Sequence, residues 1–312
     1  METIANRELR VSRRRFVSRR VRWSLYVMVL PAFLLTCLFS YTPMIGILIA
    51  FQEYQLGDEF LRSRWVGLEQ FRNMFAYPDS IQVLWNTLVI ACSKLIAGLV
   101  VPIVFALLLN EVRRNAFKRT VQTLVYLPHF LSWVVLAGIM IDLLNPDGGL
   151  LNRLVVWLGG KPVFFLGDGD WFRFTVVVSH VWKEFGYSTI IYLAALAAVN
   201  PDLYEAAEVD GASRFSQCLH VTLPSMLPII IVCSTLSLGG ILDGGFDQIY
   251  NLYNPLVYSK GDIIDTFVYR TGLQQSQFSF ATAMGLFKGV ITFVLTAAAY
   301  RIAYRYANYT IF

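Results

Sequence analysis

The sequence predicts an all-α, polytopic membrane protein with six transmembrane helices and with both ends of the chain in the cytoplasm. Of its 312 residues, 56% are hydrophobic and only 15% are charged, whereas an ordinary soluble domain carries about 25% charged residues. The apolar residues form long continuous runs rather than the alternating segments of about ten residues that build membrane β-barrels. The composition therefore indicates helices whose main solvent is lipid.

Six apolar stretches are long enough to cross about 30 Å of hydrocarbon at about 1.5 Å per helical residue. They cover roughly residues 24–50, 83–110, 121–144, 173–199, 227–250 and 281–306. A cleaved signal peptide is a poor interpretation of the first stretch, because the run from Trp23 to Phe51 exceeds the roughly 7–15 residues of a signal core. We therefore expect this stretch to remain as a membrane span.

Basic residues predict the orientation of these spans. Eight arginines precede the first one: Arg7, Arg10, Arg13, Arg14, Arg15, Arg19, Arg20 and Arg22. Such a tail could bind nucleic acid, but arginines directly before an apolar run favour a cytoplasmic anchor, so no nucleic-acid partner is expected. With residues 1–23 inside, the inside segments hold 15 Lys and Arg residues and the three outside loops hold 7. Both ends of the chain are then cytoplasmic.

Three predicted outside loops are longer than most connections between helices: roughly 52–82, 145–171 and 251–280. Their aromatic residues and mixed charges suit a docking surface, or a belt of rings at the depth of the lipid headgroups that includes Trp65, Trp157 and Trp171. The four cysteines are scattered and contain no C-x-x-C pair, which indicates neither a disulfide framework nor a metal site.

One short acidic stretch, residues 200–228, lies between the fourth and fifth spans. Asn200 is a good N-cap, Pro201 suits the first helical position, and acidic residues follow in the first turn. Gly211 is a natural stop. The pattern predicts a cytoplasmic helix of about ten residues and about 15 Å, which is too short to span a membrane.

The charge of this short helix calls for a partner. An acidic segment on the cytoplasmic side departs from the usual excess of Lys and Arg there, and orientation alone gives no reason for it. Ala206 and Ala207 keep one side thin, so that another protein can approach closely. Apolar contact is offered by Leu203, Tyr204 and Val209. We therefore expect a second protein, rather than lipid, to contact this helix.

The same residues carry a resemblance to a known family. The spacing Glu205-Ala206-Ala207, three residues, Gly211, nine residues and Val221-Thr222-Leu223-Pro224 resembles the EAA loop of permeases of binding-protein-dependent (type I) ABC importers, with valine where isoleucine is usual. The stretch LYEAAEVDGAS is similar to the maltose-type carbohydrate permeases. The segments GFDQIYNLYNPLVY and FSFATAMGLFKGVI resemble the oligosaccharide and polysaccharide branch that includes alginate-type importers.

The resemblance implies a transport function and a set of partners. In that family the EAA segment is a coupling helix that sits in a groove of an ATPase subunit, which assigns the coupling role here to Glu205, Ala206, Ala207, Asp210, Gly211, Leu223 and Pro224. Similar systems join two homologous permeases, two ATP-binding subunits and an extracellular or periplasmic solute-binding protein that delivers a glycan. ATP-driven closure of the ATPases then turns the permease cavity outward.

This chain has no GxxxxGK[ST] phosphate loop, so ATP and Mg are expected on the partner subunits and no cofactor is expected here. The resemblance further implies a non-catalytic permease domain over residues 24–312, with its importer core at about 83–306 and its coupling loop at 200–226. The predicted location is the bacterial cytoplasmic (inner) membrane.

The fourth span contains a polar face that predicts the substrate pathway. His180, Lys183, Glu184 and Tyr187 follow helical spacing, and Trp182 lies beside them. In similar sugar permeases the matching W-x-x-F-x-Y stretch lines the translocation cavity, although charged residues are not typical there. The alternative is that Lys183 pairs with Glu184 or with another carboxylate and holds helices together.

The fifth span adds Asp243 and Asp247 within a stretch whose four glycines permit close packing or a local break. An enzyme with paired carboxylates is disfavoured, because no nucleophile, base or metal ligand accompanies them at a useful spacing. A gate or cavity wall is favoured instead. Helix pairing or snorkelling is the expected role of the other charges in or near the spans, Lys94, Asp142 and Lys288.

Two other function classes remain as alternatives. An ion-coupled secondary carrier for a polar solute would also hold interior Asp, Glu, His and Lys residues, but it would need no EAA-spaced cytoplasmic helix. A membrane-embedded enzyme would gather its catalytic groups at one depth. The expected function is therefore the permease subunit of an ATP-driven glycan importer.

Overall fold

The computed structural model describes residues 20–57 and 62–307, and these residues are almost entirely helical. The N-terminal half contains α2 (Arg20–Thr36), η2 (Cys37–Tyr41), η3 (Thr42–Phe51), α3 (Glu69–Ala76), α4 (Pro78–Asn110), α5 (Asn115–Tyr126), η4 (Leu127–Phe130), α6 (Trp133–Leu144) and α7 (Leu150–Trp157). The strands β1 (Gln52–Glu53) and β2 (Arg64–Trp65) pair antiparallel as a small hairpin.

The C-terminal half holds the remaining helices. They are α8 (Gly169–Ala197), α9 (Pro201–Val209), α10 (Arg214–Gln217), η5 (Cys218–Thr222), α11 (Leu223–Leu238), α12 (Phe246–Leu252), η6 (Pro255–Val257), α13 (Tyr258–Gly261), α14 (Ile264–Tyr269), η7 (Arg270–Gln274) and α15 (Phe278–Ala307). Residues 1–19 of the predicted tail and residues 308–312 lie outside the described residues, and residues 20–23 of that tail form the start of α2. The side of the membrane on which both termini lie stays a prediction.

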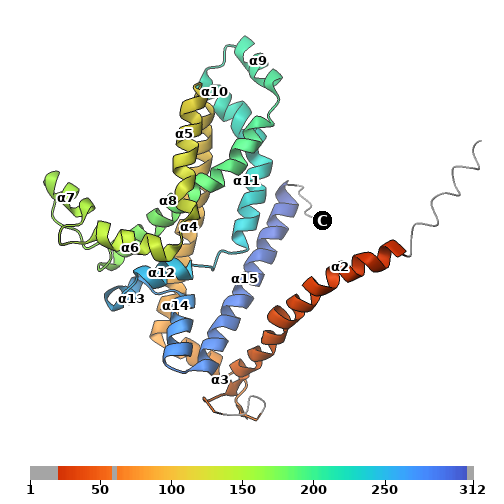
Figure 1. Cartoon of the computed structure of the whole chain (residues 1–312), viewed down its shortest axis with the longest axis vertical. Coiled ribbons are helices and arrows are strands. Elements are labelled where there is room, and N and C mark those ends of the chain that lie inside the picture. Colours follow the sequence, from red (N-terminus) through yellow and green to blue (C-terminus); the bar gives the residue numbers. More distant parts are fainter. Residues whose placement is uncertain (1–19, 58–61, 308–312) are drawn as a thin grey trace, which may run out of the picture.

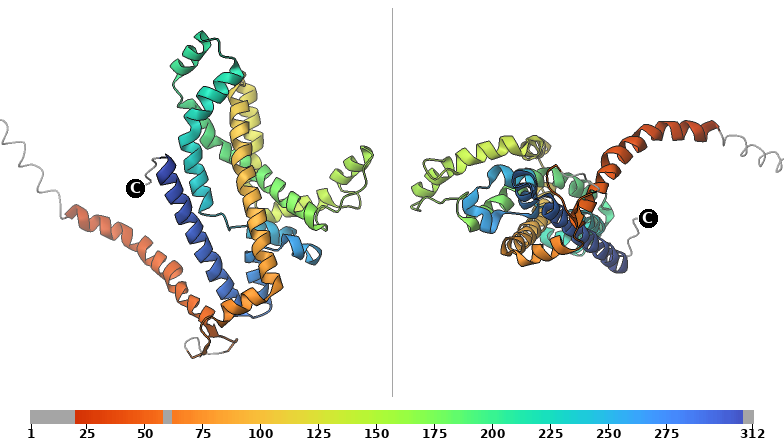
Figure 2. Two further views of the ribbon diagram at one scale, coloured as in Figure 1. Left: turned by 180° about the vertical axis from the view of Figure 1, so that it is seen from behind. Right: turned by 90° about the horizontal axis from the view of Figure 1, so that it is seen from below.

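The first predicted span is continuous through α2, η2 and η3, but it diverges from the other helices. Figures 1 and 2 show α2 leaning away from the bundle, which α4, α5, α8, α11 and α15 form. The large hydrophobic side chains of α2 whose exposure is described are each more than half exposed. Among the residues of α2, η2 and η3 whose burial is described, only Ala50 is buried. This apolar helix therefore presents its surface to lipid or to a partner.

Four helices in the described part of the chain are long and apolar enough to cross a membrane: residues 25–51, 78–110, 214–238 and 278–301. A fifth is obtained when the bent pair formed by residues 115–130 and 133–144 is counted as one span. The helix α8 is 29 residues long but is not among them; its sequence is less apolar and includes Lys183 and Glu184. Six spans therefore stay a prediction.

The third predicted span is not one straight helix. Its two halves meet at 103°, which corrects the continuous helix expected over 121–144. Pro128 lies in the 3-10 turn η4, Leu131 is extended, and the Ser132 hydroxyl then accepts a hydrogen bond from the Val135 amide as the N-cap of α6. Hydropathy carried no sign of this break, because both halves are apolar.

The fifth predicted span is also interrupted. α11 ends at Leu238, and residues 239–245 are not helical before α12 begins at Phe246. Gly245 has φ +83°, a left-handed conformation that glycine adopts without steric cost. The four glycines thus mark a break rather than a close helix contact along a continuous span, and the helix expected over 227–250 is corrected accordingly.

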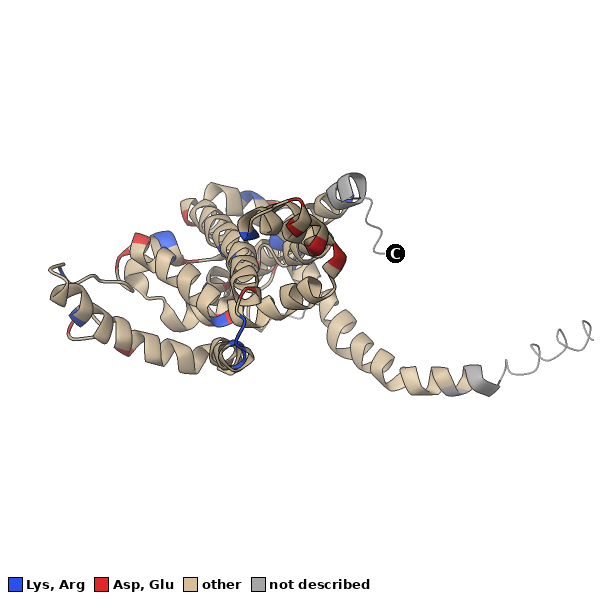
Figure 3. Cartoon of the chain, turned by 90° about the horizontal axis from the view of Figure 1, so that it is seen from above, with Lys and Arg blue, Asp and Glu red and all other residues tan. Residues whose placement is uncertain are grey.

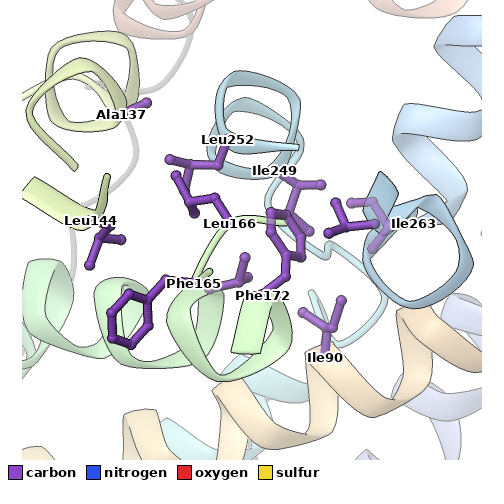
Figure 4. Packing of buried hydrophobic residues seen from close by; sticks show 11 residues of the cluster. Ile90, Ala137, Leu144, Phe165, Leu166, Phe172, Ile249, Leu252 and Ile263 are labelled. Atoms are coloured by element: carbon purple, nitrogen blue, oxygen red, sulfur yellow. The ribbon is translucent and has the colours of Figure 1, made fainter. Parts of the chain in front are cut away.

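The main buried core joins α4, α6, α8, α12 and α14 and lies away from α9. Figure 4 shows its side chains, among them Ile90, Leu144, Phe172, Ile249 and Ile263, converging from these elements. Phe172 is wholly buried. The core fixes the first turns of α8 and the helix α12 that follows the broken stretch, and it therefore positions the polar groups described next.

Candidate functional site

The acidic helix α9 has the local structure that its sequence predicts. The Asn200 side chain accepts a hydrogen bond of 3.1 Å from the Asp202 amide, and Pro201 occupies the first turn. Gly211 follows the helix with φ +76°, and no atom lies within 4 Å of the position that a Cβ would take there. The need for glycine is therefore conformational rather than steric, and the predicted helix start and stop are both confirmed.

This loop projects from one end of the bundle, and viewed from that end the positions of its acidic residues lie close together along the ribbon (Figure 3). Three apolar side chains of the loop are also exposed: Leu203 by 48%, Phe215 by 79% and Val209 by 88%. Exposed apolar groups beside acidic ones are typical of a surface that another protein covers.

The loop is tied to the bundle by side-chain and backbone bonds. The Tyr204 hydroxyl lies 3.0 Å from the Thr222 hydroxyl, which links α9 to the turn before α11. The Ala212 amide donates to the Ala207 carbonyl oxygen at 2.9 Å. The other predicted coupling residues also lie in this loop or at its return: Glu205 and Ala206 exposed on α9, Asp210 as its C-cap, and Leu223 with Pro224 in the first turn of α11.

A second feature is a polar cavity of about 400 Å³ between α4, α8, α11 and the broken stretch, which we term the polar pocket. The side chains of His180 and Glu184 from α8 line it together with Asp243 and Lys94. Ser188 and Ser237 add hydroxyl groups. The pocket thus offers donors and acceptors of both signs to a polar solute.

Lys94 holds the broken stretch in place. Its ammonium donates to the Gly244 carbonyl oxygen and to Oε1 of Gln248, both at 2.6 Å. The Gln248 amide in turn donates to the Val176 carbonyl oxygen at 2.7 Å and to the Ser179 hydroxyl at 2.8 Å. Three elements are therefore joined through one buried lysine and one buried glutamine.

Lys183 points to a different place. Its ammonium donates to the His129 carbonyl oxygen at 2.8 Å and to Oε1 of Glu184 at 3.0 Å. Nδ1 of His129 lies 2.8 Å from Oε2 of Glu184. The Lys183 ammonium thus lies at the C-terminal end of η4, where free carbonyl oxygens favour a positive charge. It also lies 5.7 Å from the centre of the Trp133 ring. This network spans the bend of the third predicted span.

The remaining predicted pathway residues are spread over several surfaces. Tyr187 stacks on the His129 ring at 4.1 Å, with an angle of 3° between the rings. Trp182 lines a separate apolar cavity of about 280 Å³ beside α6, and Asp247 is exposed on α12. The structure therefore brings His180, Glu184 and Asp243 to one pocket, whereas Lys183, Trp182 and Asp247 lie outside it.

Sequence reasoning assigned no site role to Lys94, Gln248 or His129. An intramembrane lysine at position 94 was a usable signal, but its partners are an amide and a backbone carbonyl rather than an acid. The role expected for Lys288, helix pairing, is confirmed, because its ammonium lies 2.6 Å from Oδ1 of Asp265. No spacing rule could connect His129 with a helix that begins forty residues later.

Comparison with known proteins identifies the family. Residues 98–308 match the family described as binding-protein-dependent transport system inner membrane component. The polygalacturonan/rhamnogalacturonan transport system permease protein YteP of Bacillus subtilis is 46% identical over 284 residues, which cover 91% of this chain and 88% of YteP. Protein LplB of the same organism is 43% identical over 92% of this chain and 90% of its own length.

The fold is similar to solved structures as well. A chain of a bacterial ABC transporter involved in the import of the acidic polysaccharide alginate is 39% identical, with a TM-score of 0.85 over 91% of this chain and 96% of that chain. A chain of the alginate transporter in complex with an alginate pentasaccharide-bound periplasmic protein gives 0.84 at the same identity, over 91% of this chain and 94% of that chain. The chain therefore belongs to the inner membrane components of binding-protein-dependent transport systems, as an ABC importer permease of the sugar-transporting type.

Proposed function

We propose that this chain is the transmembrane permease subunit of an ATP-driven importer that takes an oligosaccharide or polysaccharide from a solute-binding protein and passes it across the bacterial cytoplasmic membrane by alternating access. The observation that carries this proposal is its likeness, at 39% identity and a TM-score of 0.85, to a chain of a transporter that imports an acidic polysaccharide. The name of the relative YteP, a polygalacturonan/rhamnogalacturonan permease, supports the same substrate class.

The proposed topology has six spans and cytoplasmic ends. In this arrangement α5, η4 and α6 cross the membrane as one bent span, and α8 crosses as the fourth. The hydrogen bonds of Lys183 inside the protein support the placement of α8, since a charge that has partners is far less costly in a bilayer than one exposed to lipid. We place the basic tail at 1–23, the permease domain at 24–312, its importer core at about 83–306 and the coupling loop at 200–226.

The proposed assembly contains a second homologous permease, two ATP-binding subunits that hold ATP and Mg, and the solute-binding protein. The loop around α9 docks on an ATPase subunit through its acidic residues and its exposed Leu203, Val209 and Phe215. Hydrolysis takes place on those partners, so this chain is not itself an enzyme. A ligand can bias the cycle only by binding its two states with different affinity.

The proposed substrate pathway includes the polar pocket. Sugar hydroxyls can donate to Glu184 and Asp243 and can accept from His180, and an apolar cavity with a few polar groups is the usual form of a small-molecule site. Tyr187, Trp182, Lys183 and Asp247 remain proposed pathway residues, with Lys183 at present engaged by His129 and Glu184.

The test is transport by the purified complex in proteoliposomes. ATP enclosed in the vesicle should drive uptake of a labelled oligosaccharide that is supplied outside with the binding protein, and a proton gradient alone should not. Uptake driven by an ion gradient without ATP would instead favour an ion-coupled carrier.

Glu205→Lys should uncouple this complex, because a charge at the rim of the ATPase contact becomes repulsive to its former partner. We expect intact membrane insertion with a loss of about tenfold or more in glycan-stimulated ATPase activity. Glu69→Lys, at an exposed position on α3 far from α9, is the matched control. Normal ATPase co-purification together with normal transport in Glu205→Lys would contradict the assignment of α9.

A further inference from the structure

Four aromatic rings follow one another along α12 and into α13. The ring of Phe246 stacks on that of Tyr250 at 5.2 Å, Tyr250 lies 5.9 Å from Tyr253, and Tyr253 lies 5.0 Å from Tyr258. Tyr269 of α14 flanks the row, at 5.5 Å from Phe246 and 5.0 Å from Tyr250. All five rings are partly exposed. We term Phe246, Tyr250, Tyr253, Tyr258 and Tyr269 the aromatic track.

Along the chain, the aromatic track begins shortly after a lining residue of the polar pocket. Asp243 lines that pocket, and Phe246 follows it directly after the non-helical stretch 239–245. From there the track leads to α13, on the side of the molecule away from α9 (Figure 1). Phe246 and Tyr269 also line a groove of about 650 Å³ between α12, α14 and α15. The rings thus form a row that leads from the end of the non-helical stretch toward the proposed outer loops.

The chemistry of this surface suits sugar rings. A pyranose ring has an apolar face of C–H groups and a polar rim of hydroxyls, so it packs on an aromatic face and still bonds to water or to a phenol hydroxyl. Tyrosine offers both a flat apolar body and a polar tip. The spacing of 5.0–5.9 Å between successive rings of the row is close to the length of one pyranose unit in a chain.

Three cations around the aromatic track, Lys260, Arg270 and Lys288, each have an acidic partner, whereas Asp247 is exposed on α12 beside Phe246. The Arg270 guanidinium lies 4.2 Å from the centre of the Tyr258 ring and donates to Oδ2 of Asp262 at 2.6 Å. Lys260 is bonded to Asp170, and this bond lowers the pKa of the Asp170 carboxyl. Lys288 is bonded to Asp265. Since these cations have partners, the surface has no special affinity for a carboxylate. It would bind sugars by packing against the C–H faces of their rings.

We propose that the aromatic track is a glycan-binding surface on which successive sugar rings stack as a chain moves between the outer face and the polar pocket. This inference rests on the proposed function as a glycan importer and adds a site to it. The surface accepts neutral and acidic sugars alike, because stacking uses the C–H faces. Its contribution grows with the length of the glycan, since a longer chain covers more rings at once.

Tyr250 is the best position for a test. Tyr253 also packs against the buried core, so its replacement would disturb folding, whereas Tyr250 is not part of that cluster. Tyr250→Phe keeps the ring and removes the hydroxyl, while Tyr250→Leu keeps an apolar side chain and removes the flat face. Phe293→Leu is the matched control, because Phe293 is 73% exposed, lies on α15 and belongs neither to the track nor to the predicted outer loops.

The experiment measures uptake of a disaccharide and a hexasaccharide by proteoliposomes that contain the complete complex and its binding protein. We expect Tyr250→Leu to lower hexasaccharide uptake about fivefold, and disaccharide uptake by less than about twofold. Neutral and acidic hexasaccharides should be affected equally. Tyr250→Phe should stay within about twofold of the wild type, because the phenylalanine ring keeps the flat face. Phe293→Leu should do so as well, because Phe293 lies outside the track.

Equal hexasaccharide uptake by Tyr250→Leu and Tyr250→Phe would overturn the inference, whether both are normal or both are impaired. If Tyr250→Leu does not assemble, as judged by gel filtration and by ATPase activity without glycan, Phe246→Leu takes its place with the same expected loss. A wild-type complex that takes up neither glycan would contradict the proposed function itself. If instead the wild type takes up the hexasaccharide and Tyr250→Leu takes it up equally well, only the inference about the aromatic track is contradicted.

Discussion

Lys94 is the residue at which the polar contacts of three elements meet. Its ammonium satisfies the Gly244 carbonyl oxygen and the Gln248 amide oxygen inside the protein. Lys94→Met fills a similar volume but leaves both acceptors without a donor, which costs about 1–3 kcal/mol for a buried polar group. We expect a lower thermal unfolding midpoint for the purified complex, measured in detergent without substrate.

Lys161→Met, at an exposed position in the loop after α7, is the control for this loss of one lysine. An unchanged midpoint in Lys94→Met would show that the broken stretch does not depend on the ammonium. A drop of the same size in both variants would show an effect of net charge alone.

Lys183 offers a second test at the scale of a residue, because a pathway role and a structural role predict different results. If it meets a uronate carboxylate, Lys183→Met should lower glycan-stimulated ATPase activity by about fivefold more for an acidic oligosaccharide than for a neutral one. Tyr187→Ala should reduce both equally. An unchanged acidic-to-neutral ratio would assign Lys183 to the bend of the third span, where it already meets His129 and Glu184.

Among the elements, α9 was the most predictable. Its N-cap, first-turn proline and terminal glycine act within the helix itself, so the sequence alone contains the interactions that set its ends. The breaks in the third and fifth spans are also bonded to groups from other helices, Lys183 and Lys94 respectively. The hydropathy of a continuous apolar run cannot predict contacts with other helices, although the glycines near Gly245 did indicate a possible break.

Gly211 tests this local account of α9. With φ +76° and open space around its Cβ position, asparagine should be tolerated better than alanine, and valine should be worst. The expected order of glycan-stimulated ATPase activity is therefore Gly, Asn, Ala and Val, with a local conformational cost of about 1–2 kcal/mol for a non-glycine residue. Equal activity of Gly211→Val and the wild type would remove the conformational argument.

The candidate pathway was only partly predictable for a similar reason. Helical spacing correctly placed His180 and Glu184 near one another, and both line the polar pocket. It could not show that Lys183, only one position away from Glu184, reaches η4, or that Lys94 and Asp243 complete the pocket from other helices. The position of a residue around one helix limits the direction in which its side chain points, but the residues of the neighbouring helices determine which partner it contacts.

At the scale of the whole molecule, the topology rests on whether α8 crosses the membrane. α7 and α9 flank this helix, and Trp157 and Asp202 are exposed on them. We expect a membrane-impermeant maleimide to label Trp157→Cys on intact spheroplasts, and to label Asp202→Cys only after permeabilisation. Both variants are made in a chain whose four cysteines are replaced by serine. Labelling of both positions from the same side would contradict the six-span arrangement.

The interruption at residues 239–245 divides the fifth span into two bodies with different attachments. α11 is linked through Thr222 to Tyr204 of α9, whereas α12 is held by the buried core and by the bonds of Lys94 and Gln248. Under the proposed function, we expect a displacement of α9 to move α11 with it and to be accommodated by the backbone torsions of residues 239–243, ahead of Gly244, whose carbonyl oxygen is bonded to Lys94. The part of the span that leads to α9 would then move while α12 keeps its position in the core.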